Sequence, residues 1–221
     1  MSEEFAEKII DGMVDENGHC GERGLSWKQF EAIAYGCSRM VPGKERDAGG
    51  WEGDYAFRDF WERDWEGEVG KYHVKLNEYH HFHGRYIVVG IDLRPAEEYE
   101  RECWLRELGK FENSEWVAEP KKRIDMELVL VRKGGYYREP YAYRYGNLEW
   151  VNIYVLADKD GNCIVWKSAN LIEMYDEDGN WIVAKEGDKV LMKATVKEHG
   201  EYKGVKQTVV NRPKISAIEP C

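Results

Sequence analysis

Several features that would define a class of protein are missing from this sequence of 221 residues. Its five cysteines are odd in number, scattered and without a CxxC pair, which argues against a disulfide framework and a zinc ribbon. No apolar run approaches the roughly 18 residues that cross a membrane, and no apolar segment follows Met1 as in a signal peptide. Nucleophile-elbow, HExxH, kinase and phosphate-loop motifs are also missing. We therefore expect a cytoplasmic protein that is not an enzyme and needs no cofactor.

Positive charge is scarce in only one half of the chain. The whole sequence has 42 Asp and Glu against 32 Lys and Arg, a net charge of −10. Residues 1–120 hold 27 acidic and 15 basic residues, whereas residues 121–221 hold 15 acidic and 17 basic residues. This asymmetry predicts two modules that face different partners, with a boundary near residue 120.

The N-terminal half shows the spacing of short helices. Residues 3–16 place apolar side chains on one helical face, and in the next segment, GLSWKQFEAIAYGCSRM, Ser26 and Gln29 match a capping box. Residues 51–68 carry seven carboxylates between aromatic side chains spaced three and four apart, which is typical of an amphipathic helix. The aromatic face of this expected helix consists of Phe57, Phe60, Trp61 and Trp65.

Further along the chain, the apolar period changes to two residues. The runs KYHVKLNEYHHF and RYIVVGIDL flank His83 and Gly84, which predicts a β-hairpin. Residues 95–120 are charged and are interpreted as a linking or inserted segment with a helix over AEEYERECWLREL. Near the hairpin turn, His80, His81 and His83 lack a further ligand at useful spacing, so we interpret them as surface histidines and predict no metal site.

The C-terminal half, residues 121–221, contains strand-like runs with recognisable turns. RIDMELVLV is one strand, WVNIYVLA and CIVWKS form a hairpin across DKDGN, and KVLMKATVK pairs with VKQTVVNRPKI across EHGEYKG. Between the hairpins, ANLIEMYDEDGN is short enough for a helical turn or a loop. This order of elements matches the five-stranded Greek-key barrel of an OB-fold. The sequence thus predicts an α+β protein with short N-terminal helices, antiparallel β-structure and a C-terminal OB-fold-like barrel.

An OB-fold binds oligonucleotides over its second and third strands and through the loops after its first and fourth strands. Here the loop 132–147 and the stretch 196–212, which holds the loop after the fourth strand, are rich in cations and carry aromatic residues, which bind phosphates and stack on unpaired bases. A Trp-Lys pair on the third strand and the start of the fifth strand extend this pattern. The predicted nucleic-acid site comprises Arg132, Lys133, Tyr136, Tyr137, Arg138, Tyr141, Tyr143, Arg144, Trp166, Lys167, Lys197, Tyr202, Lys203, Lys206, Gln207 and Arg212.

Part of this half also resembles a known group of proteins. ADKDGNCIVWKSA followed by EGDKVLMKATVKEHGEYKGVKQTVVNRPKI is similar to the C-terminal module of uncharacterised proteins encoded by bacteriophages and other mobile elements. GLSWKQFEAI resembles a helix near the start of such proteins. The resemblance covers about a third of the chain; it departs from the usual pattern at NRPK, where TRCK-like endings are common, and in the insertion of residues 85–120. It implies an OB-type module in phage DNA metabolism. The partner predicted from the cations and aromatic residues of the two loops is single-stranded DNA or RNA.

Two other interpretations stay open. The barrel also fits a scaffold for self-association, and its loops also fit structural roles, because tyrosines pack barrel mouths and lysines protect strand edges. Alternatively, the acidic half fits an inhibitor of the anti-CRISPR or another counter-defence type, which occupies the basic channel of a host nucleic-acid-handling protein. The acidic residues assigned to that partner surface are Glu62, Asp64, Glu66 and Glu68.

Overall fold

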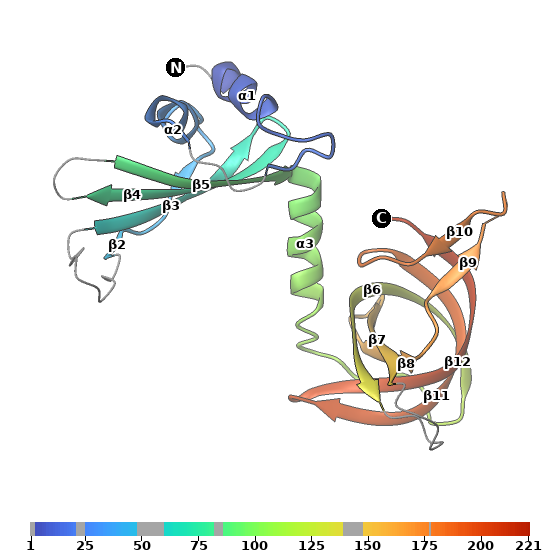
Figure 1. Ribbon diagram of the computed structural model, residues 1–221. Coiled ribbons are helices and arrows are strands. Elements are labelled where there is room, and N and C mark those ends of the chain that lie inside the picture. The colour runs from blue at the N-terminus through green and yellow to red at the C-terminus, as the bar shows by residue number, and fades with distance from the viewer. Residues whose placement is uncertain (1–2, 21–24, 48–59, 82–85, 139–147, 177) are drawn as a thin grey trace. The chain divides into compact units, whose positions relative to one another are not determined.

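The computed structural model in Figure 1 describes residues 3–20, 25–47, 60–81, 86–138, 148–176 and 178–221. The chain divides into two compact units, Met1–Glu100 and Arg101–Cys221, and each has its own hydrophobic core. The helix α3 (Ala96–Leu108) contains the point of division. Within the part of the chain that is described, no helix has the length and apolar character that a membrane span needs.

The first unit consists of an antiparallel sheet with two helices on one face (Figure 1). Apolar side chains of the helices, such as Phe30 and Ile33, are buried together with Trp65 and Leu76 of the sheet. The sheet follows the order β1, β3, β4, β5, and β2 also pairs with β3. The elements are α1 (Glu3–Asp11), α2 (Trp27–Ala34), β1 (Val41–Pro42), β2 (Arg46–Asp47), β3 (Phe60–Val69), β4 (Tyr72–His81) and β5 (Tyr86–Pro95).

Three local predictions for this half of the chain are confirmed. Ser26 caps α2, because its Oγ accepts the N–H of Gln29 at 3.4 Å while Oε1 of Gln29 accepts the N–H of Ser26 at 3.0 Å. Strands β4 and β5 form the expected antiparallel hairpin, and α3 covers the segment AEEYERECWLREL. The side chains of His80, His81 and His83 lie outside the described residues.

The predicted helix over residues 51–68 is wrong. Its described part belongs to the strand β3, which pairs antiparallel with β4 along its whole length. Trp65 is buried in the core, and the carboxylates on either side of it are partly exposed. Residues four apart share a face in a strand as well as in a helix, so the aromatic spacing did not distinguish the two. The acidic residues from Glu62 to Glu68 recur at every second position, and this strand period is the signal that was missed.

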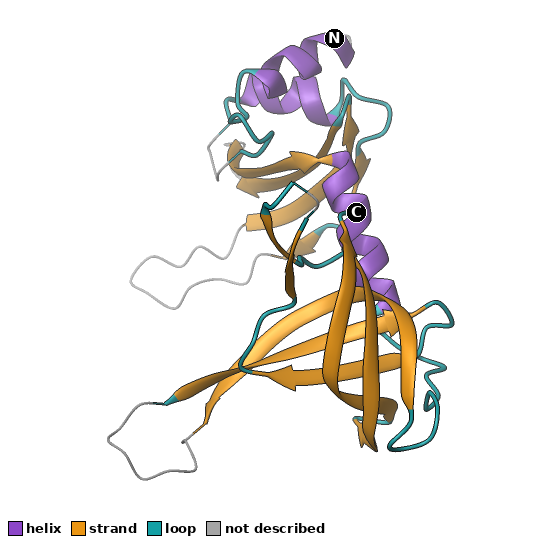
Figure 2. Cartoon of the chain, turned by 90° about the vertical axis from the view of Figure 1, so that its right-hand side faces the viewer, coloured by secondary structure: helices purple, strands orange, loops and turns teal. Residues whose placement is uncertain are grey.

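The second unit contains a closed barrel of five strands (Figure 2). Around the barrel the order is β6, β7, β8, β12, β11, and all neighbours are antiparallel except the parallel pair β8 and β12. Both predicted hairpins, β7–β8 and β11–β12, are confirmed, and the arrangement is consistent with an OB-like barrel. The strands are β6 (Arg123–Arg138), β7 (Glu149–Asp158), β8 (Cys163–Ser168), β11 (Lys189–Tyr202) and β12 (Val205–Glu219).

A small hairpin lies between the third and fourth barrel strands, where a helical turn or a loop was expected. It consists of β9 (Glu173–Tyr175) and β10 (Trp181–Val183). Met174 and Ile182 pack against the barrel core, whereas their neighbours Tyr175 and Trp181 are exposed. Strands of three residues are too short for an alternating pattern to be recognised in the sequence.

Both predicted binding loops are shorter than expected, because the flanking strands are longer. Strand β6 continues through Arg138, so residues 132–138 pair with β7 in what we call the β6–β7 arm. Strands β11 and β12 are joined only by Lys203 and Gly204, whose φ angles of 51° and 82° are typical of a two-residue type I′ turn. The paired residues 198–206 at this end are called the β11–β12 arm. Most of the described residues in the two predicted loops are therefore strand residues with a fixed side.

Candidate nucleic-acid interface

Residues on the β6–β7 arm alternate between two sides. Tyr154 is buried in the barrel core and pairs with Lys133, so Lys133 lies on the core side. Gly135 and Tyr137 follow at the strand period and share that side, which we call the mouth side. Tyr136 and Arg138 are on the opposite side. Neighbouring predicted residues therefore cannot all contact one ligand in the same way.

The outer face is the surface of the barrel strands β6, β7, β8, β11 and β12 that points away from the barrel core. A register shift between Leu130 and Arg132 brings Arg132 onto this face. Lys167 joins it because it pairs with Ile153, the neighbour of the buried Tyr154. The predicted residues that gather on the outer face are Arg132, Tyr136, Arg138, Lys167, Tyr202 and Gln207.

The chain itself occupies part of the outer face. Phe111, in the segment after α3, is buried in an apolar cluster with Cys163 and Val165, outside the barrel core. Ser114 fixes this segment, because its Oγ accepts the N–H of Cys163 at 2.8 Å and donates to the carbonyl of Lys206 at 2.7 Å. The open part of the outer face is consequently the outer side of the β6–β7 arm and the C-terminal end of β8.

The thiol of Cys163 is on the outer face but is not a nucleophile. Burial raises its pKa to about 11, an effect that the charge of Arg132 and a hydrogen bond from Gln207 only partly offset. The thiolate is the reactive form, so this cysteine stays protonated and unreactive at neutral pH.

The open part of the outer face offers an aromatic ring and cations. Tyr136 is 43% exposed, and a Cβ added at the neighbouring Gly134 would meet no atom within 4 Å. Arg132 and Lys167 are exposed and have no ion pair among the described residues. Arg138, by contrast, binds Glu149 at 2.8 Å, so its charge is largely neutralised. This surface provides one ring for stacking and two free cations for phosphates.

Trp166 was predicted as a stacking residue on the binding face, and this prediction is wrong. Its side chain points into the barrel, is 6% exposed and stacks on Tyr154 with ring centroids 5.2 Å apart. The residue belongs to the core because it pairs with Tyr154 across β7 and β8. The alternation along CIVWKS places Trp166 and Lys167 on opposite sides of the strand, so they cannot act as a pair.

The predicted residues of the β11–β12 arm are also divided between its two sides. Tyr202 is 61% exposed at the tip, with Nζ of Lys203 5.4 Å from its ring centroid. Lys206 instead binds Glu115 at 2.6 Å, and its Nζ lies 5.3 Å from the ring centroid of Trp116. Lys206 therefore helps to hold the segment after α3, whereas Tyr202 and Lys203 are open to a ligand.

The other predicted cations differ in their surroundings. Lys197 binds the neighbouring Glu198 at 2.9 Å. Arg212 is exposed and has no ion pair in the described part of the chain, but it lies beyond the β11–β12 arm in an irregular part of β12. Predictions for three residues of the first loop cannot be assessed, because Tyr141, Tyr143 and Arg144 lie outside the described residues.

Two tryptophans near these arms were missed in the sequence. Trp116 stacks on His199 with centroids 5.0 Å apart, and its Nε1 donates to the carbonyl of Gly200 at 3.1 Å. It lies in the charged linking segment, where no pattern indicated a contact with a hairpin more than 80 residues away. Trp150 was interpreted only as a strand residue, because Tyr137, with which it pairs, was predicted to lie in a loop.

The acidic residues assigned to the alternative inhibitor surface are engaged within the first unit. Arg46 binds both Glu62, at 3.0 Å, and Asp64, at 2.7 Å. Arg39 binds Glu68 at 2.7 Å. Glu66 accepts a hydrogen bond from the hydroxyl of Tyr99. Because each carboxylate has an intramolecular partner, no observation favours this surface as a docking site for a basic protein.

A polar cluster surrounds Glu66 and joins the sheet of the first unit to the start of α3. The hydroxyl of Tyr99 donates to Oε1 of Glu66 at 2.7 Å, Nε2 of His73 lies 3.1 Å from the same oxygen, and Nζ of Lys75 lies 3.4 Å from it. The His73 and Tyr99 rings are stacked, with centroids 3.4 Å apart. His73 is 5% exposed, so its protonation is tied to the packing of this unit.

The first unit should lose stability as the pH falls below about 6.5. Burial lowers the pKa of His73 from its usual 6.5, although the charge of Glu66 opposes this shift. The unfolded chain then binds a proton that the folded chain does not, so stability falls as the pH drops from 6.5 through the folded-state pKa. Urea unfolding at about pH 7.5 and about pH 5.5 measures the difference, which His73→Gln should reduce.

Glu66 adds a loss of stability at lower pH. Burial alone would raise its pKa, but the hydrogen bond from Tyr99 and the charge of Lys75 lower the pKa below the usual 4.5. Its stabilising contribution is thus present above pH 4.5 and is lost as the pH falls through the folded-state pKa.

The His73→Gln variant decides whether His73 causes the loss of stability near neutral pH. If this variant showed the same pH dependence as the unaltered chain between pH 7.5 and 5.5, burial of neutral His73 would not be the cause of that dependence.

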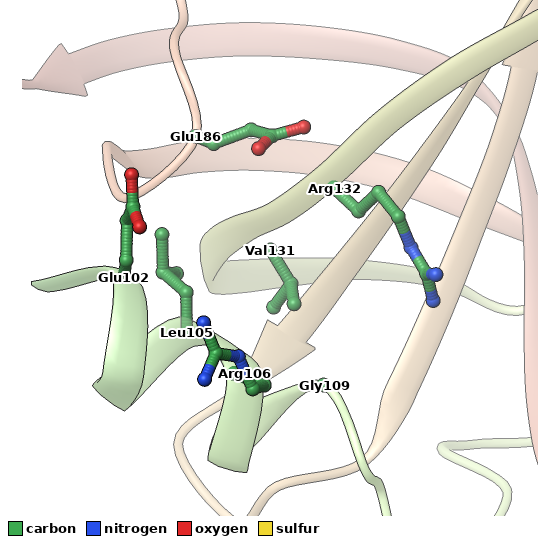
Figure 3. A pocket seen from close by; sticks show the side chains of 7 residues that line it. All are labelled: Glu102, Leu105, Arg106, Gly109, Val131, Arg132 and Glu186. Atoms are coloured by element: carbon green, nitrogen blue, oxygen red, sulfur yellow. The ribbon is translucent and has the colours of Figure 1, made fainter. Parts of the chain in front are cut away.

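A pocket of about 320 Å³ lies between α3 and β6 in the second unit. Figure 3 shows Glu102 and Arg106 projecting from the helix, with Val131 and Arg132 on the strand and Glu186 nearby. Leu105 and Val131 supply apolar surface, while the charged lining residues comprise two acids and two arginines. Because these charges balance, this pocket offers no preference for an anionic ligand.

The second unit therefore combines an OB-like barrel with one open surface that is cationic and aromatic. This surface is the outer side of the β6–β7 arm together with Lys167 of β8. Tyr202 and Lys203 form a smaller exposed pair at the tip of the β11–β12 arm. No family model matches the chain, and comparisons with curated proteins and with solved structures find no significant match.

Proposed function

We propose that the chain is a non-enzymatic protein of the OB type that binds single-stranded nucleic acid on the outer face of its barrel. The strand order supports an OB-fold, because the third barrel strand is parallel to the fifth and the fourth closes the barrel against the first. The observation that carries the proposal is the open surface formed by Arg132, Tyr136 and Lys167. An unpaired base stacks on the tyrosine while the two cations bind adjacent phosphates. Together with the resemblance to phage proteins, this suggests a role in phage DNA metabolism in the bacterial cytoplasm.

The tip of the β11–β12 arm supplies a second contact on the same face. Tyr202 provides a ring and Lys203 a cation, and Gly204 allows the tight turn that presents them. Between this tip and the β6–β7 arm lies the cluster around Phe111. A strand that reaches both contacts has to cross this cluster, so the segment after α3 limits how deeply the strand approaches β7 and β8.

Oligo-dT binding at several salt concentrations tests the proposal. Replacing Lys167 or Lys203 by alanine should reduce the slope of log K against log salt by ~0.7 for each phosphate that the protein no longer neutralises. Tyr136→Ala should weaken binding by roughly 1 to 3 kcal/mol with little change in slope, because stacking releases no counterion. Fluorescence anisotropy of a labelled oligonucleotide between about 50 and 200 mM salt gives both quantities.

Lys206→Ala is the matched control for Lys203→Ala. Both lysines lie on the β11–β12 arm, but only Lys206 is neutralised by an ion pair, with Glu115. Its substitution should leave the salt slope closer to that of the unaltered chain. Binding that is undetectable at low salt, or that survives the substitutions at Lys167, Lys203 and Tyr136 unchanged, would refute nucleic-acid binding on this face.

A further inference from the structure

A second pocket, of about 650 Å³, opens on the mouth side of the β6–β7 arm. Its walls are the arm itself and the short segment that follows β10. The volume is within the range of about 300 to 1,000 Å³ that is usual for small-molecule sites. The lining includes Lys133, Trp150, Asn152, Val183, Lys185 and Glu186.

Trp150 provides an aromatic ring that is already fixed in place. Its Nε1 donates to Oδ1 of Asn152 at 3.0 Å, and the ring of Tyr137 meets it edge-on with centroids 4.8 Å apart. The ring also lies so close to Gly135 that a Cβ there would be 2.4 Å from it. Even so, Trp150 is 43% exposed. A ring held at several points loses little freedom when a flat ligand stacks on its exposed surface.

Two lysines and one glutamate line the pocket, and the glutamate carboxylate already accepts a hydrogen bond from the backbone. The Nζ of Lys133 lies 5.8 Å from the ring centroid of the buried Tyr154, and neither Lys133 nor Lys185 has an ion pair among the described residues. The carboxylate of Glu186 accepts the backbone N–H of Lys133 at 2.7 Å. The lining thus has a net charge of +1, which suits a phosphate diester.

Asn152 adds a polar group at the base of the pocket. Its Oδ1 accepts from Trp150, and its Nδ2 donates to the carbonyl of Ala169 at 3.4 Å. The amide nitrogen carries two hydrogens, so one of them is not used by the hydrogen bonds in the described chain. The pocket therefore combines a stacking ring, a hydrogen-bond donor and two cations.

We propose that this mouth pocket binds one nucleotide unit, with its base on Trp150 and its phosphate between Lys133 and Lys185. The proposal rests on the proposed function for its ligand class, since the nucleotide is taken to be part of the bound strand. The two sites nevertheless use different residues, because the outer face uses Arg132, Tyr136 and Lys167 instead. Their contributions can be separated by substitution.

The test measures oligo-dT and thymidine monophosphate binding to the full chain. Replacing both Lys133 and Lys185 by alanine should reduce the salt slope for oligo-dT by ~0.7, because the pocket neutralises one phosphate of the strand. Trp150→Ala should weaken oligo-dT binding roughly 5- to 100-fold with little change in slope. Glu186→Gln keeps an acceptor for the Lys133 N–H but removes a negative charge, so it should strengthen binding of both ligands.

Two further measurements check that the variants are folded and locate the bound base on the protein. Circular dichroism and thermal melting confirm that each variant is folded, and Trp150→Leu replaces Trp150→Ala if the latter unfolds, because leucine keeps an apolar side chain but has no aromatic ring for stacking. An oligonucleotide that contains 5-bromodeoxyuridine should form a photo-crosslink to Trp150, located by mass spectrometry. In the Lys133 and Lys185 double variant this crosslink should decrease, whereas Lys167→Ala should leave the mouth pocket intact for thymidine monophosphate.

The outcomes distinguish the two proposals. Oligo-dT binding that depends on Tyr136 and Lys167 but not on Trp150, Lys133 or Lys185 would overturn the mouth pocket and leave the proposed function standing. Thymidine monophosphate binding that is lost with the pocket variants, without any oligo-dT binding, would support the pocket and refute the strand-binding function. If neither ligand binds at low salt, both proposals are wrong.

Discussion

Replacing Trp166 by alanine should lower the free energy of unfolding of the second unit by about 3 to 5 kcal/mol, the usual cost of removing a buried large aromatic side chain. Trp166 is 6% exposed within the barrel core and stacks on Tyr154. Its removal leaves a cavity among residues of several barrel strands, which cannot collapse without distorting the ladder. Urea denaturation followed by circular dichroism measures the change in stability.

Trp181→Ala is the matched control, because this tryptophan is 58% exposed on the β9–β10 hairpin. Its substitution should cost less than ~1 kcal/mol, as is usual for surface positions. A Trp166→Ala variant that is as stable as the unaltered chain but binds oligo-dT more weakly would favour Trp166 as a stacking residue after all. Loss of stability without a change in binding per folded molecule would confirm its role in the core.

Hairpins between successive strands and helix caps were predictable from the sequence, because they depend on residues that are close together in the chain. The β7–β8 hairpin follows from two apolar runs around DKDGN, and the cap of α2 follows from Ser26 and Gln29. The strand order around the barrel was predicted from the succession of a strand, a hairpin and a second hairpin, which matches that of an OB-fold.

The side on which each residue lies was harder to predict, because it depends on where a strand begins and on bulges within it. The bulge before Arg132 puts two successive residues on the outer face, and no residue type in VLVRKGG marks it. Contacts between residues that are far apart in the sequence could not be predicted either. Phe111 covers the outer face from outside the barrel strands, and only the folded chain shows that it does so.

Gly135→Ala should destabilise the second unit by about 1 to 3 kcal/mol, the usual cost of overpacking a site that has no free space. An added Cβ would lie 2.4 Å from Cζ2 of Trp150 and 2.7 Å from the carbonyl oxygen of Val151. The backbone oxygen belongs to the β7 strand and cannot move alone, so the Trp150 ring has to shift. That shift breaks its hydrogen bond to Asn152 and changes the mouth pocket.

Gly134→Ala is an adjacent control that separates this clash from the general effect of replacing glycine. A Cβ at Gly134 would meet no atom within 4 Å, so alanine should be neutral or stabilise the strand by up to ~1 kcal/mol by restricting the unfolded chain. The indole N–H signal of Trp150 in a nitrogen-15 spectrum should move in Gly135→Ala and stay in place in Gly134→Ala. If the mouth pocket binds a nucleotide, Gly135→Ala should also lose affinity as Trp150→Ala does, whereas equal effects of the two alanine variants would contradict the close contact between Gly135 and Trp150.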